Sequence, residues 1–173
     1  MRRLLLFGVA VLVVGCAGTM AEKELLSAGA SLQDKDGKDV GAATLIETPD
    51  GIRIAVTGYR LPPGPHGLHI HAVGQCTPPD FASAGGHFNP GGKQHGRQNP
   101  AGAHAGDLPN LVVAASGEAG IDITTKDVTL APGPNSLLGE KGTSIVIHAA
   151  ADDEKTDPTG NSGARIACGV ITK

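Results

Sequence analysis

The sequence predicts an all-β domain, either a sandwich or a barrel. Short apolar segments recur along the chain, and Gly, Pro and Asp turn signals separate them at fairly regular intervals. No segment has the periodicity of a helix longer than a turn or two. The composition agrees, because 26 glycines in 173 residues suit many turns, and 2% aromatic residues leave a core of Val, Ile, Leu and Ala.

The first residues predict an export signal. Residues 1–3 form a short basic segment. Residues 4–14 form an apolar run that is too short to span a bilayer comfortably. The run ends at Gly15-Cys16, which resembles a bacterial lipobox, so we expect cleavage before Cys16 and a lipid on that residue. The protein would then be anchored at the periplasmic or outer surface of the cell envelope. A plain signal peptide with an incidental cysteine is the alternative.

The remainder predicts one domain. After the signal peptide (1–15) comes a polar tether (16–24), and residues 25–173 suit a single domain. The net charge of −3, more negative once Arg2 and Arg3 are removed, argues against nucleic acid as a partner. Cys76 and Cys168 remain, and in an exported protein a structural disulfide is the default, with two free buried thiols as the alternative.

The first half of the domain predicts four strands. We expect them at about 25–33, 40–47, 52–59 and 67–73. An Asp-Gly turn signal joins the first strand to the second, and Pro-Asp-Gly joins the second strand to the third. Ile52, Ile54 and Val56 alternate with Arg53, Ala55 and Thr57, so the apolar set should face the core.

Residues 74–105 predict a functional loop. This segment is rich in Gly, Pro, Asn and Gln and has no apolar periodicity. Segments of this length are usually functional or disordered. Three histidines and a cysteine lie in it, which favours a loop held by metal and by a disulfide. Strands should resume at about 107–114, 121–126, 144–148 and 165–171, with a second irregular loop at 150–163.

All seven histidines lie between residues 66 and 148, and neutral imidazole is the commonest metal ligand. In the fourth expected strand, Leu68 and Ile70 should face the core while His69 and His71 face the opposite way. In the strand at 144–148, His148 faces out by the same rule. If the two strands are neighbours, three imidazoles converge on one rigid spot outside the barrel.

The loop supplies a second set of ligands. His87, His95 and His104 are followed by Asp107 at spacings of eight, nine and three. Three imidazoles and a carboxylate fill a tetrahedral zinc shell, as in a structural site. The imidazoles on the strands, with an open position, suit a redox copper ion better.

Several motifs together resemble the copper–zinc superoxide dismutases, in order and over nearly the whole mature chain. The resemblance implies an eight-stranded Greek-key β-barrel or sandwich with two long functional loops. It also implies an enzyme that converts superoxide to dioxygen and hydrogen peroxide, through alternating reduction and oxidation of a copper ion bridged to a structural zinc ion. The motifs are His69-Ile70-His71, Gly86-His87-Phe88-Asn89-Pro90, His95-Gly96, His104-Ala105-Gly106-Asp107-Leu108, Ile147-His148-Ala149-Ala150-Ala151-Asp152-Asp153 and the segment from Gly163 to Ile171.

The resemblance also assigns the ligands. It implies that the copper ligands are His69, His71, His87 and His148. It implies that the zinc ligands are His87, His95, His104 and Asp107. His87 would bridge the two ions as an imidazolate and take part in catalysis.

Residues outside the ligand sets also have counterparts in the family. Asp152 resembles the carboxylate that links His69 to His95, and such contacts orient ligands. Arg165 matches the catalytic cation that receives the anion, and Cys76 and Cys168 match the family's disulfide. His66 matches a histidine that binds backbone beneath the site and holds no metal.

One part of the family pattern is missing. Many eukaryotic members have a lysine where this chain has Pro158, and Ala149-Ala150 replaces a common Glu-Lys. We hypothesise that Lys155 substitutes as the cation that attracts superoxide.

Two other classes of function compete with the dismutase. One is a protein that stores or delivers copper and zinc without turnover, which would commonly lack a ligand or the arginine. The other is a zinc hydrolase built on His-x-His, but the aspartate that often follows the pair is Val73 here. Homodimers are usual in the resembled family, so a homodimer is possible; the sequence does not predict its face.

Overall fold

The computed structural model describes residues 25–173, and the expected signal peptide, Cys16 and the tether lie outside this range. Between 25 and 173 the only helical element is the single 3₁₀ turn η1 (Ala82–Ala84), and no helix there is long and apolar enough to cross a membrane. The strands are β1 (Ser27–Asp34), β2 (Asp39–Thr48), β3 (Gly51–Gly58), β4 (Gly64–His66), β5 (Leu68–His71), β6 (Leu111–Val113), β7 (Ala119–Thr125), β8 (Ser144–His148) and β9 (Arg165–Val170).

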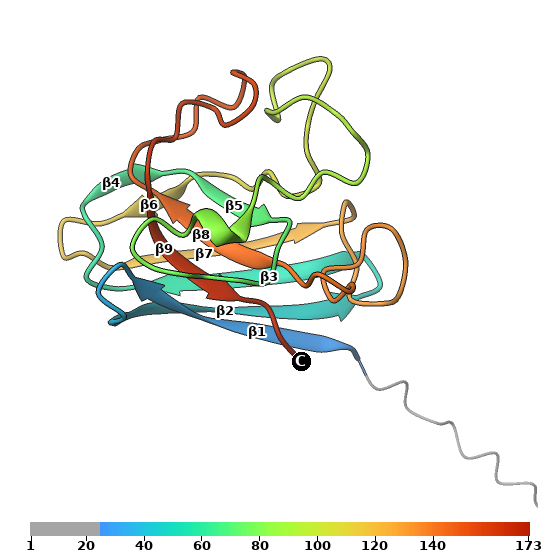
Figure 1. The fold of residues 1–173 in the computed structure, drawn as a ribbon, viewed down its shortest axis with the longest axis horizontal. Coiled ribbons are helices and arrows are strands. Elements are labelled where there is room, and N and C mark those ends of the chain that lie inside the picture. The colour runs from blue at the N-terminus through green and yellow to red at the C-terminus, as the bar shows by residue number, and fades with distance from the viewer. Residues whose placement is uncertain (1–24) are drawn as a thin grey trace, which may run out of the picture.

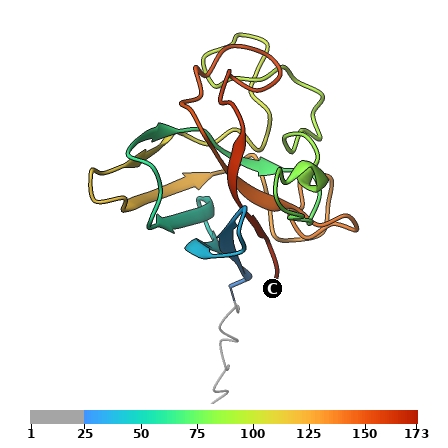
Figure 2. The same ribbon diagram turned by 60° about the vertical axis from the view of Figure 1, so that its left-hand side comes forward.

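The strands form one antiparallel sheet in the order β4-β6-β7-β3-β2-β1-β9-β8-β5, and Figures 1 and 2 show it curled into a barrel. The expected all-β barrel is therefore confirmed. There are nine strands where eight were expected, because the chain changes partner at Gly67. His66 pairs with Leu111 of β6, whereas Leu68 pairs with Ile147 of β8. The expected strand at 67–73 is thus preceded by the separate strand β4.

Strand alternation builds the core. Ile52, Ile54 and Val56 of β3 are buried, as predicted. Leu68 and Ile70 of β5 also belong to the main apolar cluster inside the barrel, together with their β8 partners. The core consists mainly of Leu, Ile, Val and Ala.

The strand expected at about 107–114 is shorter than predicted. Only Leu111–Val113 forms β6, and Asp107 makes an isolated bridge with His69 instead. The reason is local, because the Asp107 carboxylate accepts the backbone N–H groups of Gly96 and His104 and so organises a loop.

A second, small apolar cluster lies outside the barrel. Phe81 and Ala84, at η1, pack with Val146 of β8 and with Cys168. The predicted disulfide joins Cys76 to Cys168, with Cα atoms 5.6 Å apart. It fastens the loop that carries η1 to the outer face of β8 and β9.

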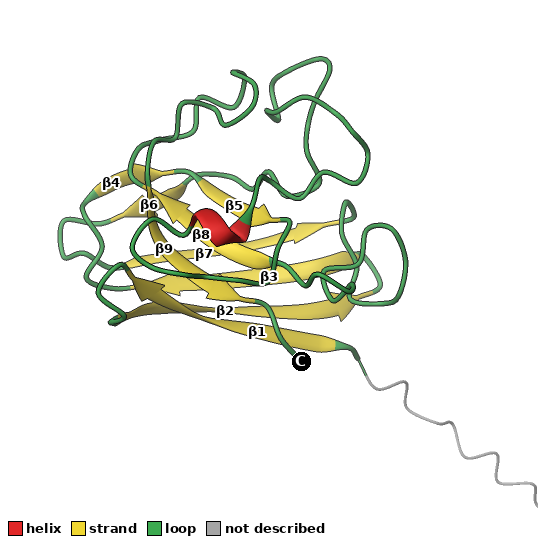
Figure 3. Cartoon of the chain, in the orientation of Figure 1, coloured by secondary structure: helices red, strands yellow, loops and turns green. Residues whose placement is uncertain are grey.

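The two long loops lie together above β5 (Figure 3). Gln98 N–H donates to the Glu154 carbonyl, and the Asn99 side-chain amide donates to the Lys155 carbonyl. His95 N–H donates to the Asp157 carboxylate. These bonds bring segments far apart in sequence into one lid, and the lid covers the histidines of β5.

Candidate metal centre

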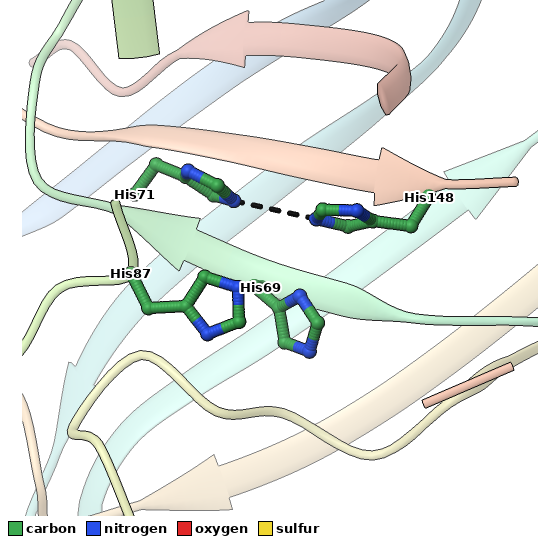
Figure 4. A group of neighbouring side chains, drawn as sticks. All are labelled: His69, His71, His87 and His148. Atoms are coloured by element: carbon green, nitrogen blue, oxygen red, sulfur yellow. Dashed lines mark hydrogen bonds between the residues drawn. The ribbon is translucent and has the colours of Figure 1, made fainter. Parts of the chain in front are cut away.

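Four imidazoles converge where the lid meets the barrel (Figure 4). β5 carries His69 and His71, β8 ends at His148, and His87 comes from the first loop. One ligand nitrogen from each ring lies within 4.8 Å of the others, a geometry that could hold one metal ion. The strand pairing that the sequence argument required is present, since β5 pairs with β8. All four side chains are buried, because the lid closes over that face of the barrel.

The second nitrogen of each strand imidazole is already engaged. His71 Nδ1 donates to the Gly85 carbonyl at 2.9 Å, and His148 Nδ1 donates to the Gly163 carbonyl at 3.2 Å. His69 Nε2 donates to an Asp152 oxygen at 2.8 Å. Each ring therefore keeps one lone pair directed into the group.

Two nitrogens within the group of four imidazoles have no hydrogen-bond partner although they are buried. They are His69 Nδ1 and His87 Nε2. Buried polar atoms are almost always satisfied, so an unpaired pair in one cluster indicates a missing ligand. A metal ion in the middle of the four imidazoles would satisfy both, and nitrogen-rich sites suit Cu(II).

The protonation states agree with metal binding. Burial lowers the pKa of His69 to about 4, that of His71 to about 2 and that of His148 to about 3. These rings are therefore neutral at pH 7, which is the ligating form of imidazole.

A second group surrounds Asp107. Its Oδ1 lies 3.0 Å from His87 Nδ1, 3.1 Å from His95 Nδ1 and 3.2 Å from His104 Nδ1. A tetrahedral zinc ion with bonds of about 2.0–2.1 Å separates its ligand atoms by about 3.3–3.4 Å, so the cluster is close to the required size. His95 Nδ1 is also a buried nitrogen without a hydrogen-bond partner.

Proximity alone would also place His69 with His87, His95 and Asp107. His104 fits this group better, because its Nδ1 lies 3.4 Å from His87 Nδ1 as well as near Asp107. His87 belongs to both groups, with Nδ1 toward Asp107 and Nε2 toward the strand imidazoles.

Electrostatics favours an ionised Asp107. Burial favours the neutral acid, but the hydrogen bond from His87, the Gly96 N–H and the neighbouring imidazoles outweigh it and lower the Asp107 pKa well below its usual range. Burial also lowers the pKa of His104. An anionic carboxylate beside three imidazole nitrogens is the donor set of a zinc site.

Asp152 joins the two groups. One of its oxygens accepts His69 Nε2 at 2.8 Å and the other accepts His95 Nε2 at 3.0 Å. Asn110 holds the backbone of Asp152 in turn, donating to its carbonyl at 2.9 Å and accepting its N–H at 2.8 Å. Sequence reasoning missed Asn110, since a residue that acts through backbone contacts leaves no pattern of its own.

Gly160 is a second residue that the sequence did not single out. Its φ is +61°, and an added Cβ would meet the Asp152 carboxylate and the His95 ring at less than 3 Å. Only glycine fits there without displacing the contact between Asp152 and His95.

Arg165 borders the first group of imidazoles. It pairs with His148 in the β8–β9 ladder, and its guanidinium donates to the carbonyls of Phe81 and Gly85. Together with His71, His87 and His148 it lines a cavity of about 350 Å³. The disulfide-bonded loop therefore orients this cation through its carbonyl groups.

The remaining predicted residues lie outside this cavity. His66 is buried below it, with Nδ1 2.7 Å from the His148 carbonyl and Nε2 2.8 Å from the Pro62 carbonyl. Lys155 is exposed on the second loop and is not among the residues that line the cavity.

The whole domain is similar in sequence to known proteins. A sequence model described as "Copper/zinc superoxide dismutase (SODC)" matches residues 39–171. The chain is 49% identical to "Superoxide dismutase [Cu-Zn] 2" of Aquifex aeolicus, over 84% of this chain and 86% of the relative. It is 46% identical to "Superoxide dismutase-like protein YojM" of Bacillus subtilis, over 81% of this chain and 73% of the relative.

Solved structures agree in fold. A superoxide dismutase-like protein from Bacillus subtilis superposes with a TM-score of 0.81 at 44% identity, over 83% of this chain and 97% of the other. The Cu/Zn superoxide dismutase from Brucella abortus superposes with a TM-score of 0.70 at 30% identity, over 85% of this chain and 100% of the other.

Proposed function

The chain belongs to the copper/zinc superoxide dismutase family, and from this premise we propose that it disproportionates superoxide at a copper ion bridged to a structural zinc ion. His69, His71, His87 and His148 would hold the copper ion. His87, His95, His104 and Asp107 would hold the zinc ion. Copper, when bound, supplies the one-electron chemistry by which one superoxide leaves as dioxygen and a second leaves, with two protons, as hydrogen peroxide.

The observation that carries this proposal is the position of His87. Its Nδ1 faces the Asp107 cluster, and its Nε2 is a buried, unpaired nitrogen facing the strand imidazoles. A ring placed in this way can offer one nitrogen to each of two metal ions. Nε2 is also the atom at which the chain can take up and return a proton beside the cavity, while Nδ1 stays held.

Arg165 distinguishes turnover from storage. A storage or delivery protein needs no anion-binding group beside its copper ligands, whereas an enzyme acting on a small anion does. The guanidinium lies in the wall of the cavity that reaches His71, His87 and His148, and carbonyl oxygens fix its direction. It would bind superoxide and orient it toward the copper ligands.

The experiment is a rate measurement on protein loaded with copper and zinc. The loaded protein should consume superoxide, and His148→Ala should abolish the reaction while the zinc content is retained. A loaded protein that binds both metals but does not consume superoxide would favour storage or delivery.

Three features beyond the site are part of the proposal. Cys16 carries a lipid that anchors the protein at the periplasmic or outer envelope surface, and Cys16→Ser should release it from the membrane fraction.

Lys155 contributes to attracting superoxide, so Lys155→Glu should lower the rate constant and flatten its dependence on salt. A homodimer would be visible by sedimentation.

A further inference from the structure

The three histidines around Asp107 differ in what their second ring nitrogen contacts. His95 Nε2 donates to Asp152 at 3.0 Å, and His87 Nε2 faces the strand imidazoles. His104 also has its Nδ1 beside Asp107, but its Nε2 makes no hydrogen bond within residues 25–173. A histidine that binds a metal almost always donates its second ring N–H to a carboxylate, a carbonyl group or water. A partner for His104 Nε2 is therefore expected.

Asp157, in the second long loop, is the candidate partner. Its Oδ1 lies 3.9 Å from His104 Nε2, and no other carboxylate oxygen of residues 25–173 comes within 4.0 Å of that nitrogen. The gap is about 1 Å longer than a charge-assisted hydrogen bond. The Asp157 side chain is 48% exposed, so it has room to close that gap.

The same carboxylate is already attached to the second ligand that the first loop supplies. Asp157 Oδ1 accepts the backbone N–H of His95 at 2.6 Å. An ionised carboxylate has about four acceptor positions, so this bond leaves Asp157 free to accept a second donor. One side chain of the second loop thus lies between His95 and His104 of the first.

His104 stands where the group around Asp107 meets open space. His104 and His87 line the cavity of about 350 Å³, whereas His95 and Asp107 do not. A zinc ion that left toward the cavity would have to pass one of these two rings. His87 is directed to both ligand groups, so the hold on His104 should decide how readily zinc leaves.

We propose that Asp157 is a positioning residue for zinc, which holds His95 through its backbone N–H and accepts the Nε2–H of His104 once zinc is bound. This inference deepens the proposed function and rests on it. A carboxylate that accepts the second N–H of a ligating imidazole fixes the direction of the ring and makes the ligand more basic. Asp157 therefore slows the release of zinc.

The effect should be confined to zinc. The Asp152 carboxylate supports His69 as well as His95, so it serves both ligand groups. Asp157 makes its contacts to His95 and His104 alone among the metal-binding histidines. Loss of such a partner typically weakens metal binding about tenfold to a hundredfold, and a half-exposed carboxylate belongs at the lower end of that range.

The test compares Asp157→Asn with Glu154→Gln, a matched control from the same loop. Asparagine keeps an oxygen for the His95 N–H but removes the negative charge. Glu154 also reaches the first loop, with its carboxylate 3.7 Å from Arg97 and 3.2 Å from the Gln98 amide, and neither contact involves a histidine. A chelator is added to the copper- and zinc-loaded proteins, and the rate of zinc release is measured.

Asp157→Asn should release zinc about tenfold faster than the wild type, and Asp157→Ala should release it faster still. Copper content should stay at the wild-type value in both variants, and Glu154→Gln should match the wild type throughout. An unchanged rate of zinc release in Asp157→Asn would overturn the inference. Equal acceleration in Glu154→Gln would overturn it too, because the contact between the loops would then suffice as the cause.

An NMR measurement tests the contact itself. In the reduced, metal-loaded wild type, the His104 Nε2–H should give a downfield signal that exchanges slowly with water. Asp157→Asn should move this signal upfield and speed its exchange, whereas Glu154→Gln should leave it in place. A signal that is missing in the wild type, or identical in Asp157→Asn, would reject the contact.

Neither measurement depends on turnover. A wild type that binds both metals but does not consume superoxide would refute the proposed function. The rates of zinc release and the His104 signal would still decide whether Asp157 positions the zinc ligands.

Discussion

The two ligand groups are built differently, although they share a histidine. The group of four imidazoles stands mostly on strands, where the pairing of β5 with β8 fixes His69, His71 and His148. The group around Asp107 stands on a loop without regular structure, and bonds from Asp107, from Asp152 and between the loops keep it in place. The barrel therefore holds the first group in place, whereas contacts within and between the two loops hold the second.

Removing both metals should have the largest effect and should separate the two regions. A ligand present at about 1000 times its Kd stabilises a protein by about 4 kcal/mol per site. Chelation should lower the free energy of unfolding by at least that amount. Hydrogen exchange should accelerate at residues 86–107 and 150–163 while β1, β2 and β3 stay protected. Equal acceleration in barrel and lid would show that the lid is not the weaker region.

Loss of the disulfide should come next. Cys76→Ser removes a cross-link between residues 92 apart in sequence, and such losses typically cost about 2–5 kcal/mol. It also frees the carbonyls that orient Arg165, so activity should fall while the copper content is kept. Chemical denaturation and metal analysis test both points. The wild type under reducing conditions is the matched control. A large loss of copper from the reduced wild type would contradict the expectation that copper is kept without the disulfide.

Asp152→Ala should weaken zinc more than copper. Its carboxylate supports His69, which the strand also holds, and His95, which only the loop holds. Losing a contact of this kind typically costs about tenfold to a hundredfold in metal affinity. Competition with a chelator measures both affinities. Asp153→Ala is the control, because that carboxylate accepts bonds only within its own loop. Equal losses of the two metals would contradict the distinction between strand and loop.

Ile54→Val should have the smallest effect and should be confined to the barrel. The side chain is fully buried in β3, and loss of one methylene typically costs about 0.5–1.5 kcal/mol. Metal content and the rate with superoxide should stay at wild-type values. A drop in zinc content would mean that the lid depends on core packing.

The sequence predicted the strand-borne part of the site best. Alternation placed Leu68 and Ile70 in the core and therefore His69 and His71 on the other face, and this needed no knowledge of tertiary structure. The deep burial of those histidines could not be foreseen, because it comes from a lid whose contacts run between backbone groups of two distant loops. For the same physical reason, the sequence pattern did not indicate a role for Asn110 or Gly160. The break of the strand at Gly67 was missed too, since it depends on which partner strand lies on each side.

That break determines how the sheet ends. β4 and β5 are the two edges of the sheet, and a single residue, Gly67, links them along the chain. Free strand edges are where foreign strands add and where chains stack into fibres. Here each edge is only three or four residues long, and the covalent chain holds the two edges together. The turn that brings His69 and His71 to the metal centre is thus also the covalent link between the two ends of the sheet.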